Sequence, residues 1–169
     1  MFTFFFTEAS PFSQWYRCTF TAGTAGTAGA AGGHTFNCAE QYMMHGKALL
    51  FGDAEVAAEI LAADHPRKHK ALGRKVRGFD DARWKREREA IVRAGNHAKF
   101  TQNAALREQL LATRGTTLVE ASPYDRIWGI GLAASDPRAQ DPAKWRGQNL
   151  LGRILTALRE ELLTVPATA

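Results

Sequence analysis

Glu40 and Lys47 are the first pair of residues whose types and spacing could support chemistry. They stand seven residues apart in a stretch with helical periodicity, and seven steps of about 100° fall within ~20° of two full turns. The acid and the amine are therefore predicted on one helix face, where both could reach a molecule lying over Met43 and Met44. Two structural alternatives stay open: Glu40 could complete a capping box with Asn37, and Lys47 could be a solvated lysine.

A second candidate site lies in the sequence EASPYDRIWGIG, residues 120–131, which follows an apolar, β-branched run. A rigid strand that ends in a loop commonly presents functional side chains to a cleft. Here it would present the Asp125 carboxylate beside the Trp128 indole, while Gly129 lets the backbone approach a ligand. The structural alternatives are that Asp125 caps the turn and that Trp128 fills the core.

Further residues could contribute to binding. Phe12, Trp15 and Tyr16 cluster near the start of the chain, and such rings are platforms for a flat base, although core packing is their commoner use. Asn149 stands at an expected helix start, where it could bind ribose hydroxyls or cap the helix. The sequence contains no phosphate-loop signature, no nucleophile elbow and no metal-ligand spacing, so we expect neither a metal nor a cofactor.

Positive charge is concentrated in one segment. Residues 65–99 contain 12 Lys or Arg and 4 acidic residues, whereas the whole chain of 169 residues carries a net charge of +5. This segment could attract phosphates or a nucleic-acid backbone, or it could be the solvated face of two helices. The two cysteines, Cys18 and Cys38, are expected to be reduced thiols. Without a basic leader or an apolar run of about 18 residues, we expect a soluble cytoplasmic protein that does not contact the membrane.

The elements that must position these residues are mostly helical. Periodicity and capping signals predict strands at 1–7, 16–22, 34–37 and 116–122, and helices at 37–51, 53–64, 66–76, 81–100, 103–114 and 145–163. Residues 23–33, in which Thr-Ala-Gly recurs, are expected to form a flexible loop. Gly46 inside the first helix costs about 1 kcal/mol relative to alanine and indicates a close neighbour, most commonly another helix. The predicted fold is a predominantly helical α+β domain, residues 1–169, with a small β-sheet.

Several of these segments occur together in one order. They read FSQWY, AEQYMMHGKALLFGD, KALGRKVRGF, WKRER, KFTQN, LVEASPYDRIWGIG and WRGQNLLGRIL. In this combination, from about Phe4 to Leu162, the chain resembles the NADAR family of YbiA-like N-glycosidases. The resemblance implies cleavage of an N-glycosidic bond at C1 of a ribose. It implies catalytic roles for Glu40, Lys47 and Asp125, and substrate contacts from Trp15, Arg74, Trp84, Trp128, Gly129 and Asn149.

The resemblance also implies two substrate classes. One is ADP-ribose attached to guanine, in DNA, RNA or free nucleotide, with an ADP-ribosyltransferase toxin as the candidate partner whose modification is reversed. The other is a phosphorylated ribosylamino-pyrimidine of riboflavin synthesis. The basic segment favours the first class. A rival of a different kind is a non-catalytic ADP-ribose or nucleic-acid binder. Gln14 and Trp15 depart from the asparagine and phenylalanine common in the family, and the loop at 23–33 resembles an insertion, which puts substrate identity in question.

Two mechanisms are consistent with this reading. In the first, Lys47 attacks C1 as a neutral amine and opens the sugar to a Schiff base, which requires a lowered pKa. In the second, Glu40 or Asp125 activates water directly and Lys47 binds phosphate or a hydroxyl.

Overall fold

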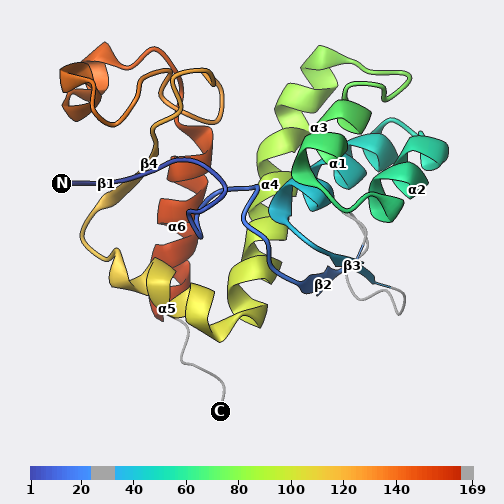
Figure 1. Ribbon diagram of the computed structural model, residues 1–169, viewed down its shortest axis with the longest axis horizontal. Helices are drawn as coiled ribbons and strands as arrows, with labels where there is room; N and C mark the ends of the chain where they lie inside the picture. The colour runs from blue at the N-terminus through green and yellow to red at the C-terminus, as the bar shows by residue number, and fades with distance from the viewer. Residues whose placement is uncertain (24–32, 165–169) are drawn as a thin grey trace. The chain divides into compact units, whose positions relative to one another are not determined.

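The computed structural model describes residues 1–23 and 33–164 (Figure 1). Residues 24–32, most of the predicted loop, lie outside this description. The described chain contains two short 3₁₀ turns, Pro137–Gln140 and Pro142–Lys144, together with four β-strands and six α-helices. These are β1 (Phe2–Phe5), β2 (Phe20–Ala22), β3 (His34–Phe36), α1 (Ala39–Leu50), α2 (Ala54–Ala62), α3 (Pro66–Gly73), α4 (Asp81–Gln102), α5 (Ala104–Ala112), β4 (Thr117–Glu120) and α6 (Leu150–Thr164). The predicted helical α+β class is confirmed.

The chain folds into two compact units. The helical unit contains residues 14–103, and the split unit is built from residues 1–13 and from the described chain after residue 103. Glu40 and Lys47 therefore belong to the helical unit, whereas Asp125 and Trp128 belong to the split unit.

Helix α1 is the centre of the helical unit, where it packs against α2, α3 and α4. Two glycines allow its close approach to α4. A Cβ added to Gly46 would lie 2.9 Å from Cγ2 of Ile91, and one added to Gly95 would lie 2.5 Å from Cδ1 of Tyr42. The glycine inside α1 is thus explained by a neighbouring helix, as predicted.

The described strands form two separate two-stranded sheets, whereas the sequence predicts one small sheet. In the helical unit β2 pairs antiparallel with β3, so that Phe20 lies opposite Phe36 and the two rings stack with centroids 5.7 Å apart. In the split unit β1 pairs in parallel with β4, from Phe2 opposite Thr117 to Phe5 opposite Glu120. Helix α6 packs against β4 (Figure 1), and its buried residues include Leu151, Leu155 and Leu158.

The helix starts follow the predicted capping chemistry at three places. Asp53 and Asp80 are the N-caps of α2 and α4 and accept from the backbone N–H groups of Val56 and Arg83, while Pro66 opens α3. These N-terminal signals are local, so they survive in the folded chain.

Two predicted helix boundaries are wrong. Helix α3 ends at Gly73 rather than near Val76, because the N–H of Lys75 bonds back to the carbonyl of Leu72 and closes a tight turn. Helix α6 begins at Leu150 rather than at Trp145, because the preceding residues pair with the loop after β4 instead of with the helix.

Candidate functional site

Lys47 lies in the last turn of α1 with its amine in a partly aromatic setting. Its Nζ donates a 2.8 Å hydrogen bond to the carbonyl oxygen of Gly73 in α3. The same nitrogen lies 4.5 Å from the ring centroid of Phe79 and 5.6 Å from that of Trp84. Lys47 is therefore no freely solvated lysine, since one carbonyl and two rings fix its amine.

The electrostatic surroundings favour the neutral amine. Burial, and then the positive charge of Arg74, lower the pKa of Lys47 below that of an ordinary lysine. Arg74 is the exposed C-cap residue of α3, next to the glycine whose carbonyl holds the amine. A neutral amine that donates one hydrogen to a carbonyl keeps its lone pair for a carbon electrophile.

Glu40 lies in the first turn of α1, with only 4% of its surface exposed. The structural alternative for Glu40, a capping box with Asn37, is not formed, because the N-cap residue is Cys38 and no side chain caps it. The backbone N–H of Asn37 instead donates 2.8 Å to Oε1 of Gln41, one residue further along. The backbone N–H of Glu40 donates 2.9 Å to the carbonyl of Gln14. Glu40 is thus a buried carboxyl group on the same helix as Lys47, and its catalytic role stays a prediction.

Trp15 is half-buried and directly follows this carbonyl. Beside it, Nδ2 of the fully buried Asn96 donates 2.7 Å to Oε1 of Gln14. Within the described chain, Nε2 of Gln14 and Oδ1 of Asn96 have no hydrogen-bond partner. Sequence reasoning singled out Gln14 but missed Asn96, because a mid-helix asparagine gives no local signal that it is buried.

Asp125 holds the loop after β4 together. Its Oδ1 accepts hydrogen bonds from the backbone N–H groups of Ile127 (2.8 Å) and Trp128 (2.7 Å). Its own N–H donates 3.2 Å to Oγ of Ser122. The structural alternative considered for Asp125, that it caps the turn, is thus realised through one oxygen. In the part of the chain that the structure covers, no hydrogen bond to Oδ2 of this carboxylate is recorded.

Gly129 and Trp128 continue this loop. A Cβ added to Gly129 would lie 2.8 Å from the carbonyl oxygen of Glu120 and 3.1 Å from that of Asp125. The glycine is therefore required by the loop's own backbone, whether or not a ligand also approaches it. The indole of Trp128 is half-buried.

Asn149 has a positive φ of 52° and is fully buried. Its Oδ1 accepts 3.0 Å from the N–H of Glu120, and its Nδ2 donates 3.0 Å to the carbonyl of Leu118. The amide thus bridges the Leu118 carbonyl and the Glu120 N–H of β4, a role that neither sequence alternative included. That it also contacts a ribose stays a prediction.

Seven of the nine predicted site residues gather in two groups. In the helical unit, Trp84 lies near the amine of Lys47, and the charge of Arg74 acts on that amine. In the split unit, Asp125, Trp128 and Gly129 share one loop, to which Asn149 is bonded through its backbone N–H and the Gly129 carbonyl. Phe79, which ends one of the quoted motifs, was missed because an aromatic after a glycine gives no sign of what it contacts.

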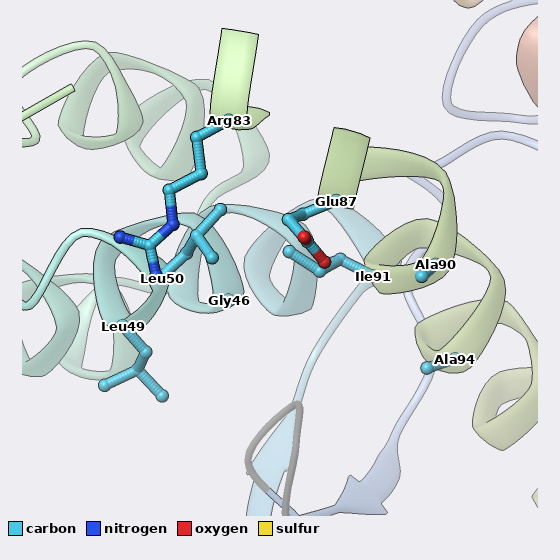
Figure 2. A pocket seen from close by; sticks show the side chains of 8 residues that line it. All are labelled: Gly46, Leu49, Leu50, Arg83, Glu87, Ala90, Ile91 and Ala94. Carbon is cyan, nitrogen blue, oxygen red and sulfur yellow. The ribbon is translucent and has the colours of Figure 1, made fainter. Parts of the chain in front are cut away.

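A hollow of about 440 Å³ lies between α1 and α4 (Figure 2). Gly46 and Ile91 form part of its apolar lining, and the side chains of Arg83 and Glu87 lie along it. None of the residues predicted to act on substrate lines it.

Other site classes find no support among residues 1–23 and 33–164. In these ranges no group of three or more His, Cys, Asp or Glu side chains could hold a metal ion. No described helix is both long enough and apolar enough to cross a bilayer. Cys38 is buried with Sγ 3.5 Å from Nδ1 of His69, and burial raises the pKa of its thiol to about 11, which suits a structural cysteine.

Comparisons with known proteins find relatives in both sequence and fold. Protein irg-1 of Caenorhabditis elegans is 45% identical over 131 residues, which cover 76% of this chain and 62% of that protein, so the match spans less than two thirds of its length. N-glycosidase R617 of Acanthamoeba polyphaga mimivirus is 49% identical over 123 residues, covering 73% of this chain and 72% of the viral protein. A maize protein, Riboflavin biosynthesis protein PYRR, chloroplastic, is 34% identical over 120 residues, covering 68% of this chain and 18% of that protein.

The NMR structure of the Escherichia coli protein YbiA superposes with a TM-score of 0.73 and 27% identity, covering 96% of this chain and 84% of that chain. The sequence of N-glycosidase YbiA from the same organism is 32% identical over 130 residues, covering 77% of this chain and 72% of that protein. The family model of the NADAR domain matches residues 3–163. This chain belongs to the NADAR domain family, whose named relatives include N-glycosidases.

Proposed function

We propose that this protein hydrolyses the bond between C1 of a ribose and a base nitrogen, and that it removes ADP-ribose from ADP-ribosylated guanine in nucleic acid or nucleotide. The observation that carries the proposal is the seating of Lys47, whose amine is bonded to the Gly73 carbonyl between two aromatic rings. Burial and Arg74 lower its pKa, which is the condition for a nucleophilic lysine.

In the proposed reaction the Lys47 lone pair forms a bond to C1 as the C1–N bond to the base breaks, and the base leaves with a proton. The bond between C1 and the ring oxygen then breaks, the ring oxygen takes a proton, and the lysine nitrogen gives up its protons and forms an imine to C1. Water adds to the imine, and collapse of the adduct releases the free sugar and the amine. The net change is the addition of one water across the glycosidic bond.

Glu40 and Asp125 are proposed to handle the protons in this sequence. The burial of Glu40 in the first turn of α1, the helix that also carries Lys47, supports a role as an acid or base. Asp125 keeps one oxygen outside the turn that it caps. An ADP-ribosyltransferase that modifies guanine would supply the substrate.

Borohydride reduction during turnover tests the covalent step. A reduced adduct on Lys47, found by mass spectrometry and absent in Lys47→Ala, is the expected result. Absence of any adduct in an enzyme that turns over would eliminate the Schiff base and leave direct attack by water. In Glu40→Gln, turnover should fall while ADP-ribose binding persists.

The second candidate substrate is the ribosylamino-pyrimidine phosphate of riboflavin synthesis. It is supported by the 34% identity to the maize riboflavin biosynthesis protein. Parallel incubation with ADP-ribosylated guanine oligonucleotide and with the pyrimidine compound, followed by chromatography of the released sugar phosphates, decides between them. No release from either substrate would favour the non-catalytic binder.

A further inference from the structure

Helix α3 and the residues that follow it form an unbroken run of positive charge. Between Asp64 and Asp80 the chain contains six Lys or Arg and no acidic residue. This run supplies half of the 12 cations in residues 65–99. The other half is not a continuous surface, because Arg88 and Lys99 are buried in α4.

Ion pairing separates these cations into two kinds. Arg77 is held by Asp53 at 2.6 Å and Glu55 at 2.9 Å, and Lys85 at the start of α4 is held by Asp81 at 2.6 Å. The other five cations between Asp64 and Asp80 are exposed and form no ion pair with any residue of the described chain: Arg67, Lys68, Lys70, Arg74 and Lys75. They therefore keep their full charge for a partner in solution.

These five residues, here called the α3 basic face, lie on the exposed side of α3 and in the turn that follows it. Arg67, Lys70 and the C-cap residue Arg74 follow the three- and four-residue spacing of a single stripe, Lys68 lies beside it, and Lys75 follows in the turn. The opposite side is buried through His69 and Leu72. The stripe extends roughly 10 Å at 1.5 Å per residue, which matches about three phosphates of a stacked strand at ~3.4 Å each.

The α3 basic face ends at the candidate nucleophile. Arg74, its last stripe residue, follows Gly73, whose carbonyl accepts the hydrogen bond from Nζ of Lys47. A nucleic-acid strand whose phosphates lie along α3 would therefore place its next nucleotide at the amine of Lys47. A free nucleotide would engage only the end of the face nearest Arg74.

We propose that the α3 basic face binds the phosphate backbone of single-stranded nucleic acid and thereby delivers a modified base to Lys47. This inference rests on the proposed function in one respect: it assumes that the bound strand carries the glycosidic bond that is cleaved. A membrane surface fits less well, because the exposed side of α3 offers charges and Ala71 but no large apolar side chain to insert.

Two triple variants test the surface. Lys68→Gln/Lys70→Gln/Lys75→Gln removes three unpaired charges from the α3 basic face. Lys85→Gln/Arg138→Gln/Lys144→Gln removes three charges that are paired with aspartates, so the two proteins have the same net charge. Binding of an unmodified, fluorescein-labelled 15-nucleotide single strand, as DNA and as RNA, is measured by anisotropy between 50 and 300 mM KCl.

The first triple variant should bind about tenfold or more weakly at low salt, and its slope of log affinity against log salt should be shallower by roughly 2, at ~0.7 per lost phosphate contact. The control variant should stay within about twofold of wild type, since paired cations release few counterions. Equal losses in both variants would overturn the proposal in favour of a net-charge effect. Binding to phosphatidylserine vesicles without binding to either strand would overturn it in favour of a lipid surface.

Turnover separates this inference from the proposed function. With guanine-ADP-ribosylated oligonucleotide, the α3 variant should lose about as much kcat/KM as it loses affinity, while its turnover of the ADP-ribosylated mononucleotide stays within about twofold. Wild type that binds the strand through α3 but releases no sugar from any substrate would contradict the proposed function alone. An α3 variant with unchanged oligonucleotide turnover and binding would contradict this inference alone.

Discussion

Nζ of Lys47 and the carbonyl oxygen of Gly73 are joined by a 2.8 Å hydrogen bond that links the last turn of α1 to the end of α3. Gly73 also has no room for a side chain, because an added Cβ would lie 2.0 Å from Sδ of Met44. The same residue thus sets the distance between two helices and the direction of the amine. Its neighbour Arg74 contributes the charge that, after burial, helps to lower the pKa of Lys47.

Arg74→Gln should move the pH profile of kcat to higher pH. Removing the cation raises the pKa of Lys47, so a smaller fraction is neutral at pH 7, and kcat at saturating substrate should fall several-fold there. Because the amine still deprotonates, kcat should recover toward that of wild type in alkaline buffer. Arg138→Gln, an exposed arginine paired with Asp136, is the control and should leave the profile unchanged. A raised KM with an unchanged pH profile of kcat would instead show that Arg74 acts only by binding substrate.

Asp125→Asn separates the structural and chemical roles of this carboxylate. The amide oxygen can still accept from the N–H groups of Ile127 and Trp128, so the free energy of unfolding should change by less than about 1 kcal/mol. The charge and the proton affinity are lost, and kcat should fall about 100-fold or more. Urea unfolding and single-turnover kinetics measure the two effects. If the Asp125→Asn protein is fully active, the role of Asp125 is structural and limited to capping the turn.

Asn149→Ala should destabilise the split unit. It leaves the N–H of Glu120 and the carbonyl of Leu118 without their side-chain partner, and alanine is strained at a φ of 52°. We expect a loss of roughly 2–4 kcal/mol, with about 1–3 kcal/mol for each abandoned buried group. Thermal unfolding measures the loss, and KM of the surviving folded protein should stay near that of wild type. A stable variant with a raised KM would support the ribose contact instead.

Gly95→Ala should destabilise the helical unit despite the better helix propensity of alanine. The new Cβ would lie 2.5 Å from Cδ1 and 3.0 Å from Cγ of Tyr42, a rigid and buried ring. We expect a cost of roughly 1–3 kcal/mol, typical of overpacking. Ala94→Ser, at the exposed neighbouring position, should change stability by less than about 0.5 kcal/mol. Urea midpoints compare the two variants, and equal midpoints would mean that α1 and α4 separate at little cost.

The helices were predictable where their signals are local. Asp53 and Asp80 mark helix starts by accepting hydrogen bonds from the backbone N–H groups of nearby residues, and Pro66 marks one through its fixed φ; all three starts are found in the structure. The start of α6 was not predictable in this way. Arg146 and Asn149 bond to the carbonyls of Ile130 and Gly129, so the segment is held by a loop that lies well before it in sequence.

The candidate site shows the same limit. The helical spacing of Glu40 and Lys47 follows from periodicity, but the surroundings of the amine do not. Gly73, Phe79 and Trp84 come from a different helix, a turn and a third helix. Lys99 is the clearest failure, because composition counts it among the surface charges although it is fully buried with a pKa lowered to about 8 by that burial.

The parallel pairing of β1 with β4 means that β1 is synthesised well before the strand with which it pairs. At about 5–20 residues per second, the ribosome needs roughly 5–20 s to reach Thr117, the partner of Phe2. Meanwhile residues 14–103, which form the helical unit and carry Lys47 and α3, are all synthesised before that partner. The nascent chain thus contains the whole helical unit while its first strand is still an unpaired, phenylalanine-rich edge.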